Sequence, residues 1–148
     1  MDQETIYDDM LGALTWNSDL DWWEGRVDMQ SSHSISISLT VEDDDNEVPD
    51  IDTLLQHGRR IVTFVREHEP EARLVAADTL LEIYNREWND ETPLDDEEFM
   101  GRLILDDVNV AADGSAELFY KDDGLFAGHT VLVTIDAAGN FADADVAG

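Results

Sequence analysis

The stretch Ser34–Val41 reads SISISLTV, and it decides the fold of this 148-residue chain. Its apolar residues alternate with serine and threonine, so an extended strand here has one apolar face and one polar face. Such a strand belongs to a sheet that packs one face against a core and leaves the other in water. The segments on either side should therefore provide further strands, and helices to cover the apolar face.

Further strands are predicted before and after this stretch. Leu11–Trp16 and Trp22–Met29 flank the turn-forming cluster Asn17-Ser18-Asp19 and predict a hairpin. The last third of the chain contains four more strand-like segments with glycine-containing turns between them: Leu103–Val110, Ala116–Lys121, Thr130–Ile135 and Phe141–Val146.

The first of these late segments changes its inward parity. The apolar residues up to Leu105 share one parity, and those from Val108 onward share the other. The pair Asp106-Asp107 lies between them. One extra residue in a strand produces such a switch, so the pattern predicts a β-bulge or a bend at the two aspartates.

The middle third predicts helices. Apolar residues from Ile51 to Val65 recur at helical spacing, and Asp50 is the expected N-cap. Pro70 suits the first position of a second helix, whose apolar seam runs from Leu74 to Trp88. Because the joint is so short, we expect the two helices to form an antiparallel pair.

A third, short helix is predicted to start at Asp95. Asp95 and Glu98 have the spacing of a capping box. Leu94 and Phe99 occupy the two positions of a hydrophobic staple around that cap. This is the clearest helix start in the chain.

The expected fold is therefore α+β. It consists of an antiparallel sheet of about seven strands, in the order βββ-ααα-ββββ, with the helix pair and the third helix on one face. Residues 1–148 are expected to form one domain, because no repeat and no long linker divides them. Residues 1–10 are expected to be flexible or loosely packed against it.

The composition is strongly acidic: 36 Asp and Glu residues against 8 Lys and Arg residues give a net charge of −28. Such a surface disfavours nucleic acid, anionic membranes and self-association, and it favours basic partners. We therefore expect a monomer or weak dimer. Two explanations of the acidity stay open, a general adaptation to high salt and a specific basic partner.

Several kinds of site are disfavoured. There is no cysteine, which excludes disulfides and thiolate chemistry. Neither the acidic run Glu42–Glu47 nor the four histidines have the spacing of a calcium loop or a zinc site, so no metal and no cofactor are expected. Residues 1–10 do not resemble a signal peptide, and no apolar run reaches 18 residues. We expect a cytoplasmic protein.

The first candidate site is the aromatic segment Trp22-Trp23-Glu24. Adjacent strand residues face opposite ways, so only one of the two tryptophans can enter the core. The other lies under residues 1–10, in a groove or on an exposed face. An exposed tryptophan beside a carboxylate suits the recognition of a basic or amphipathic partner.

The second candidate is the loop Asp122–His129, which contains two glycines and the apolar residues Leu125 and Phe126. Asp122, Asp123, Phe126 and His129 are candidate partner contacts, with Phe126 expected to be exposed. An Asp–His pair can also act as a general base. No serine, cysteine or threonine stands out as its nucleophile, so no catalytic residue is assigned and hairpin architecture remains the simpler interpretation.

Several aromatic and glycine motifs resemble a bacterial family, the domain of unknown function numbered 2262. The motifs are Leu14-Thr15-Trp16-Asn17, Leu20-Asp21-Trp22-Trp23-Glu24-Gly25, Tyr84-Asn85-Arg86-Glu87-Trp88, the capped helix from Asp95 through Phe99, and Gly124-Leu125-Phe126-Ala127-Gly128-His129. The resemblance runs from about Leu11 to Gly148 and supports a single domain. It carries no known activity, and this chain differs from the family mainly in its acid excess.

Three functions stay open. The leading hypothesis is a non-enzymatic protein-binding module; its sharpest form is an immunity-type protein that neutralises a basic toxin, by analogy with small domains of this general type. The first alternative is a small-ligand-binding or hydrolytic domain that uses the Asp122–His129 loop. The second is a housekeeping domain with a salt-adapted surface.

Overall fold

The computed structural model describes residues 5–28, 34–41, 50–89, 92–121, 126 and 129–147. Its strands are β1 (Thr5–Asp8), β2 (Gly12–Asn17), β3 (Trp22–Asp28), β4 (Ser34–Thr40), β5 (Ile104–Val110), β6 (Ala116–Lys121), β7 (Thr130–Ile135) and β8 (Phe141–Ala147). Its helices are α1 (Ile51–Ile83), which continues into the π-helical turn η1 (Tyr84–Trp88), and α2 (Asp96–Gly101). The fold is α+β, as predicted.

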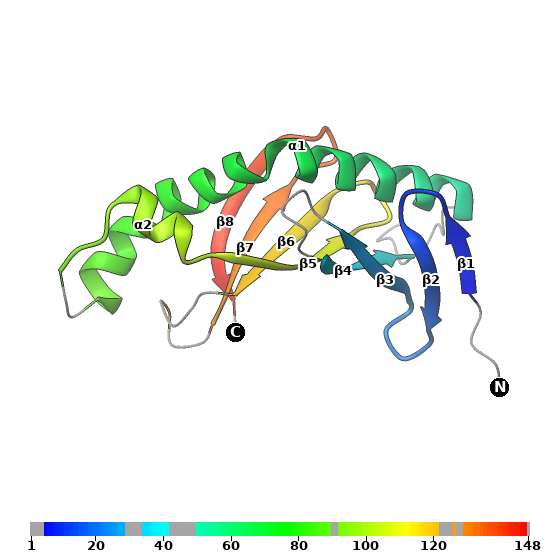
Figure 1. Cartoon of the computed structure of the whole chain (residues 1–148), viewed down its shortest axis with the longest axis horizontal. Helices are drawn as coiled ribbons and strands as arrows, with labels where there is room; N and C mark the ends of the chain where they lie inside the picture. The colour runs from blue at the N-terminus through cyan, green and yellow to red at the C-terminus, as the bar shows by residue number, and fades with distance from the viewer. Residues whose placement is uncertain are drawn as a thin grey trace.

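The strands form one eight-stranded sheet in sequence order, from β1 to β8. Neighbours are antiparallel except β4 and β5, which pair in parallel with Ser36 opposite Asp107. A parallel pair needs a long crossover connection, and α1 with α2 provides it. Figure 1 shows α1 running along one side of the sheet, with α2 at its C-terminal end. The fully antiparallel sheet that the sequence predicts is therefore wrong at this central pair.

The sheet gains an edge strand that the sequence analysis does not anticipate. Within residues 1–10, expected to be flexible or loosely packed, Thr5–Asp8 pairs with β2, placing Ile6 opposite Leu14. The strand count is therefore eight instead of about seven. Residues 1–4 lie outside the described part of the chain.

The predicted antiparallel helix pair is wrong, because one continuous helix spans both segments and Pro70 lies inside it. The reason is the phase of the apolar residues. Val65 and Ala72 are seven residues apart, two helical turns, and both are buried on the same face. One helix thus buries a single stripe on both sides of Pro70. Packing of that stripe outweighs the backbone hydrogen bond that an exposed interior proline removes.

The core lies between α1 and the inward face of the sheet. Helix and sheet approach each other closely at Gly58, where an added Cβ would lie 2.9 Å from Leu11 Cδ1 and 3.0 Å from Leu39 Cδ2. The helix contributes Leu54, Ile61, Val62, Val65, Ala72, Ala76, Ala77 and Leu80, and the central strands contribute Ile35, Ile37, Leu39, Val108, Val110, Leu118, Tyr120, Val131, Val133 and Ile135. All of these side chains are buried.

Four arginines of α1 join the helix to its surroundings. Arg59 donates to Oδ1 of Asp8, a buried carboxylate whose Oδ2 accepts the backbone N–H groups of Met10 and Leu11. The other three donate to backbone carbonyls: Arg60 to Gly114 and Ala137, Arg66 to Asp28, and Arg73 to Met100. Much of the scarce positive charge is therefore used inside the fold.

The predicted start of the third helix is confirmed as α2. The carboxylate of Asp95 accepts the backbone N–H of Glu98 at 2.8 Å, which is the expected N-cap bond. Leu94 packs against the core and Phe99 is fully buried, as the hydrophobic staple requires. Among the helices of the described residues, none combines the length and the apolar composition needed to cross a bilayer.

Replacing Pro70 tests whether α1 is continuous. Inside a helix, Pro70→Ala restores a hydrogen bond and removes a steric clash, and we expect the free energy of unfolding to rise by about 2 kcal/mol after allowing for the freer unfolded chain. Urea denaturation measures the change. Glu71→Ala, at the exposed neighbouring position, is the control and should change stability by less than about 0.5 kcal/mol. An unchanged or lower stability in Pro70→Ala would show that proline starts a separate helix.

Candidate binding face

The face of the sheet opposite α1, here called the open face, carries the outward residues of each strand. They lie in two cross-strand rows: Glu24, Ser38, Asn109, Glu117, Thr134 and Asp143, and beside them Arg26, Ser36, Asp107, Phe119, Leu132 and Asp145. All except the buried Ser38 are exposed or half-buried. This surface is therefore largely polar and available for contact.

The predicted irregularity in β5 is confirmed, and it shapes the open face. Leu105 pairs with Tyr120 and Asp107 with Phe119, so Asp106 is the extra residue of a bulge. Because of that extra residue, Leu105 and Val108 are both buried in the core. Asp107, directly after Asp106, points outward onto the open face. In a regular strand, residues 105 and 108 would lie on opposite faces of the sheet.

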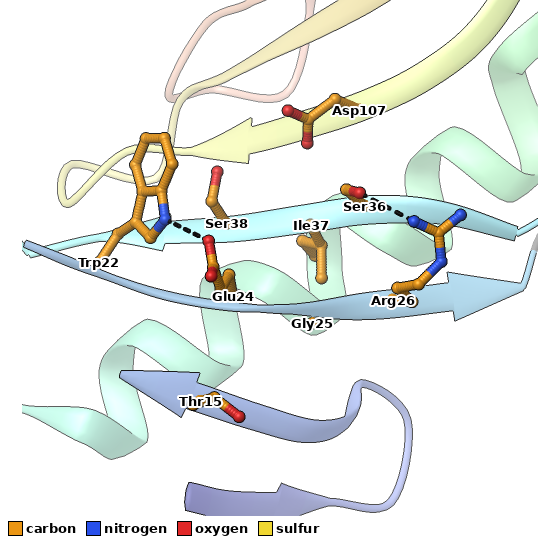
Figure 2. Close-up of a pocket in the computed structure, with 9 residues that line it drawn as sticks. All are labelled: Thr15, Trp22, Glu24, Gly25, Arg26, Ser36, Ile37, Ser38 and Asp107. Atoms are coloured by element: carbon orange, nitrogen blue, oxygen red, sulfur yellow. Dashed lines mark hydrogen bonds between the residues drawn. The ribbon is translucent and has the colours of Figure 1, made fainter. Parts of the chain in front are cut away.

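A groove of about 560 Å³ crosses the open face over β2–β5. Figure 2 shows the indole of Trp22 at one end, Glu24 and Ser38 beside it, and the carboxyl of Asp107 further along the strands. The strand register agrees, because Trp22 lies opposite Thr40 whereas Asp107 lies opposite Ser36. The lining residues are Thr15, Trp22, Glu24, Gly25, Arg26, Ser36, Ile37, Ser38 and Asp107.

Two charged residues of the groove, Glu24 and Arg26, have hydrogen-bond partners within the protein. Glu24 accepts the indole N–H of Trp22 at 2.8 Å on one oxygen and the amide of Asn17 at 3.3 Å on the other. The guanidinium of Arg26 donates to the hydroxyl of Ser36 and to the carbonyl and hydroxyl of Ser34. These bonds hold both side chains along the strands.

Asp107 differs from both. Its Oδ1 is enclosed and has no hydrogen-bond partner among the described residues. Burial raises the pKa of Asp107, and the negative charges of Asp106 and Glu24 add to the rise, whereas the backbone N–H of Val108 and the charge of Arg26 oppose it. The ionised carboxylate is thus incompletely compensated by its surroundings.

A second hollow, of about 210 Å³, adjoins the groove at the bulge. Asp107 lines both spaces, and Asp106, Phe119, Tyr120, Lys121 and Thr130 complete the second one. We call it the bulge hollow. Two carboxylates line the bulge hollow, those of Asp106 and Asp107. The carboxylate of Asp106 already has a cation, because Lys121 Nζ lies 3.5 Å from its Oδ1.

The structure separates the two tryptophans as the strand pattern predicts. Trp23 is only 9% exposed and lies in the core, where its ring meets Trp16 edge-on at 5.3 Å between centroids. Trp22 is half-buried and lines the groove beside Glu24. Of the candidates in this segment, Trp22 and Glu24 are on the open face and Trp23 is not.

The second candidate segment is only partly described. Asp122 and Asp123 lie outside the described residues, so the predicted Asp–His proximity has no structural description. Phe126 is 0% exposed, and the expectation that it lies on the surface is wrong. It packs edge-on against Tyr84 and Trp88, and His129 lies edge-on to Trp88 at 5.8 Å. In this cluster Trp88 is the exposed member, at 41%.

Sequence reasoning missed Arg26, Ser36, Asp107 and Phe119 as members of a site. The signal for Asp107 was the parity switch, which predicted the bulge but not the cavity around it. In the part of the chain with described coordinates, no three His, Asp or Glu side chains are close enough to hold a metal ion. The predicted acidic loop at Glu42–Glu47 falls outside that part.

Residues 8–146 match the family of uncharacterized proteins conserved in bacteria, domain of unknown function 2262. The chain belongs to this family. The match covers β2–β7, the helices between them and all but the last residue of β8, so every residue of the groove and the bulge hollow lies within the DUF2262 domain. No curated protein and no solved structure matches the chain.

Two aspartates should have opposite effects on stability. Arg59 and two backbone N–H groups lower the pKa of Asp8, so its charge stabilises the fold above about pH 4 and this contribution is lost as the pH falls through the folded-state pKa. The raised pKa of Asp107 has the reverse sign: stability falls as the pH rises from about 4 through its folded-state pKa.

At pH 7 we therefore expect Asp8→Asn to lower the free energy of unfolding by about 2 kcal/mol, because charge-assisted bonds to a buried carboxylate are lost. Asp107→Asn should raise it, and the gain should shrink toward pH 4. Urea titrations at several pH values measure both effects. A loss of stability at pH 7 in Asp107→Asn would mean that its carboxylate has a stabilising partner.

Proposed function

We propose that this protein is a non-catalytic module that binds a basic partner protein on its open face. The observation that carries the proposal is the groove over β2–β5, which combines the half-buried indole of Trp22 with the carboxylates of Glu24 and Asp107. A half-buried tryptophan provides apolar contact area at low entropic cost. Such residues dominate binding energy in protein interfaces.

Charge supports a basic partner. The net charge of −28 attracts cations over a distance of about one Debye length, which raises association rates. The position of binding is then determined by the hydrogen-bonded pair Trp22 and Glu24 in the groove. Glu24 is already oriented by Trp22 and Asn17, so little side-chain freedom is lost when a partner binds.

In its sharpest form, the partner is a basic bacterial toxin, and the protein neutralises it as an immunity-type protein does. Binding at the open face would then cover a basic surface that the toxin uses on its own target. Belonging to the family gives no activity that favours or opposes this form. A toxin whose inhibition requires Trp22 would support it.

The test uses a nona-arginine peptide as a basic probe, with isothermal titration calorimetry at about 0.15 M ionic strength. We expect Trp22→Ala to weaken binding about tenfold, and Glu24→Gln to weaken it by a smaller factor. The controls are Trp88→Ala, which removes an exposed indole away from the groove, and Glu82→Gln, which removes an exposed charge from α1. Both should bind like the unmodified protein.

Equal losses in Glu24→Gln and Glu82→Gln would contradict a defined binding face. Binding would then follow overall charge alone, as expected of a housekeeping domain with a salt-adapted surface. Each variant is first compared with the unmodified protein by thermal denaturation, so that unfolding is not mistaken for lost binding.

A further inference from the structure

We propose that the bulge hollow binds the guanidinium group of an arginine side chain of the partner, between the carboxyl of Asp107 and the ring of Phe119. The inference rests on the proposed function and specifies the chemistry of one contact. Among the described residues that line the two spaces, each of the other charged side chains has a partner, whereas Asp107 has a carboxylate oxygen without one. The phenolic hydroxyl of Tyr120 in the bulge hollow also has no partner there, but it carries no charge to balance.

The cations nearest to Asp107 are committed elsewhere. Arg26 is in the same cross-strand row, but its two terminal nitrogens donate to Ser34 and Ser36. Lys121 approaches Asp106. Asp107 receives the backbone N–H of Val108, and this leaves Oδ1 without a donor. A donor from outside the chain would complete this carboxylate.

Asp107 can be reached from two directions, because it lines both the groove and the bulge hollow. Its enclosed oxygen need not remain enclosed. The terminal torsion of an aspartate is broad and nearly two-fold, so a modest rotation turns Oδ1 toward either space. The carboxyl can then offer both oxygens to one planar group.

Phe119 favours guanidinium over ammonium. It lies directly opposite Asp107 on β6, is half-buried, and lines the bulge hollow. A guanidinium is planar and weakly hydrated, donates two parallel hydrogen bonds to a carboxylate and stacks on an aromatic ring. An ammonium is a strongly hydrated point charge that cannot do both. The pairing of a carboxylate with an aromatic ring therefore selects arginine.

Lys121 makes a second, opposite prediction possible. Its ammonium repels an incoming cation, yet it is exposed, and the ion pair that it makes within the described part of the chain is with the exposed Asp106. Removing it with Lys121→Met keeps the apolar stem and frees a second carboxylate next to Asp107. Affinity for an arginine side chain should then increase, whereas most surface changes in a binding site reduce affinity.

The experiment compares nona-arginine and nona-lysine peptides, which have equal charge, by calorimetry on the full chain. We expect the unmodified protein to prefer the arginine peptide by about tenfold. Asp107→Asn and Phe119→Leu should reduce that preference to less than about twofold, and Lys121→Met should strengthen arginine binding several-fold. The matched control Asp145→Asn removes one charge from the same row at β8 and should keep the preference.

The outcomes separate this inference from the proposed function. If the affinity for the arginine peptide falls in Trp22→Ala but not in Asp107→Asn, the guanidinium site is overturned. The proposed binding of a basic partner on the open face is then unaffected. Absence of a preference for arginine in the unmodified protein also overturns the site. Failure of both peptides to bind overturns both proposals. Thermal denaturation of every variant confirms that the comparison is made between folded proteins.

Discussion

The continuous apolar stripe of α1 is the contact on which the rest of the structure depends. Because the stripe keeps its phase across Pro70, one helix runs along the sheet and covers a single face. The same helix forms the crossover that makes β4 and β5 parallel, which brings Ser36 and Ser38 next to Asp107 and Asn109. The opposite face has no helix on it within the described residues. The groove follows from this one-sided cover.

The acid excess has a structural counterpart in the use of the few cations. Three arginines of α1 bond to Asp8 or to backbone carbonyls of a turn and a strand end and join the helix to the sheet, and Arg73 joins it to α2 through the carbonyl of Met100. Arg26 is bound to serines and Lys121 to Asp106. The surface is acidic because Asp and Glu outnumber Lys and Arg by 36 to 8, and the bonds of these few cations tie them to groups of the fold. A cationic partner would supply what the open face lacks.

Features that depend on neighbouring residues could be predicted from the sequence. The SISISLTV strand, the Asp95 cap, the opposite directions of Trp22 and Trp23, and the bulge at Asp106-Asp107 follow from short-range spacing. The break expected at Pro70 does not occur because helix packing over 33 residues outweighs the local preference of proline. Phe126 was misjudged because aromatic rings distant in sequence enclose it. The cavity at Asp107 depends on four strands and on a parallel pairing, which no local pattern specifies.

The proposed function requires that cations bind to the face of the sheet that α1 leaves open. Chemical-shift mapping tests it most directly: backbone amides of the ¹⁵N-labelled protein are followed while nona-arginine is added. We expect shifts concentrated on β3–β6 around Trp22, Ser36 and Asp107, with α1 nearly unaffected. Shifts spread evenly over the acidic surface, or concentrated on the solvent side of α1, would contradict it.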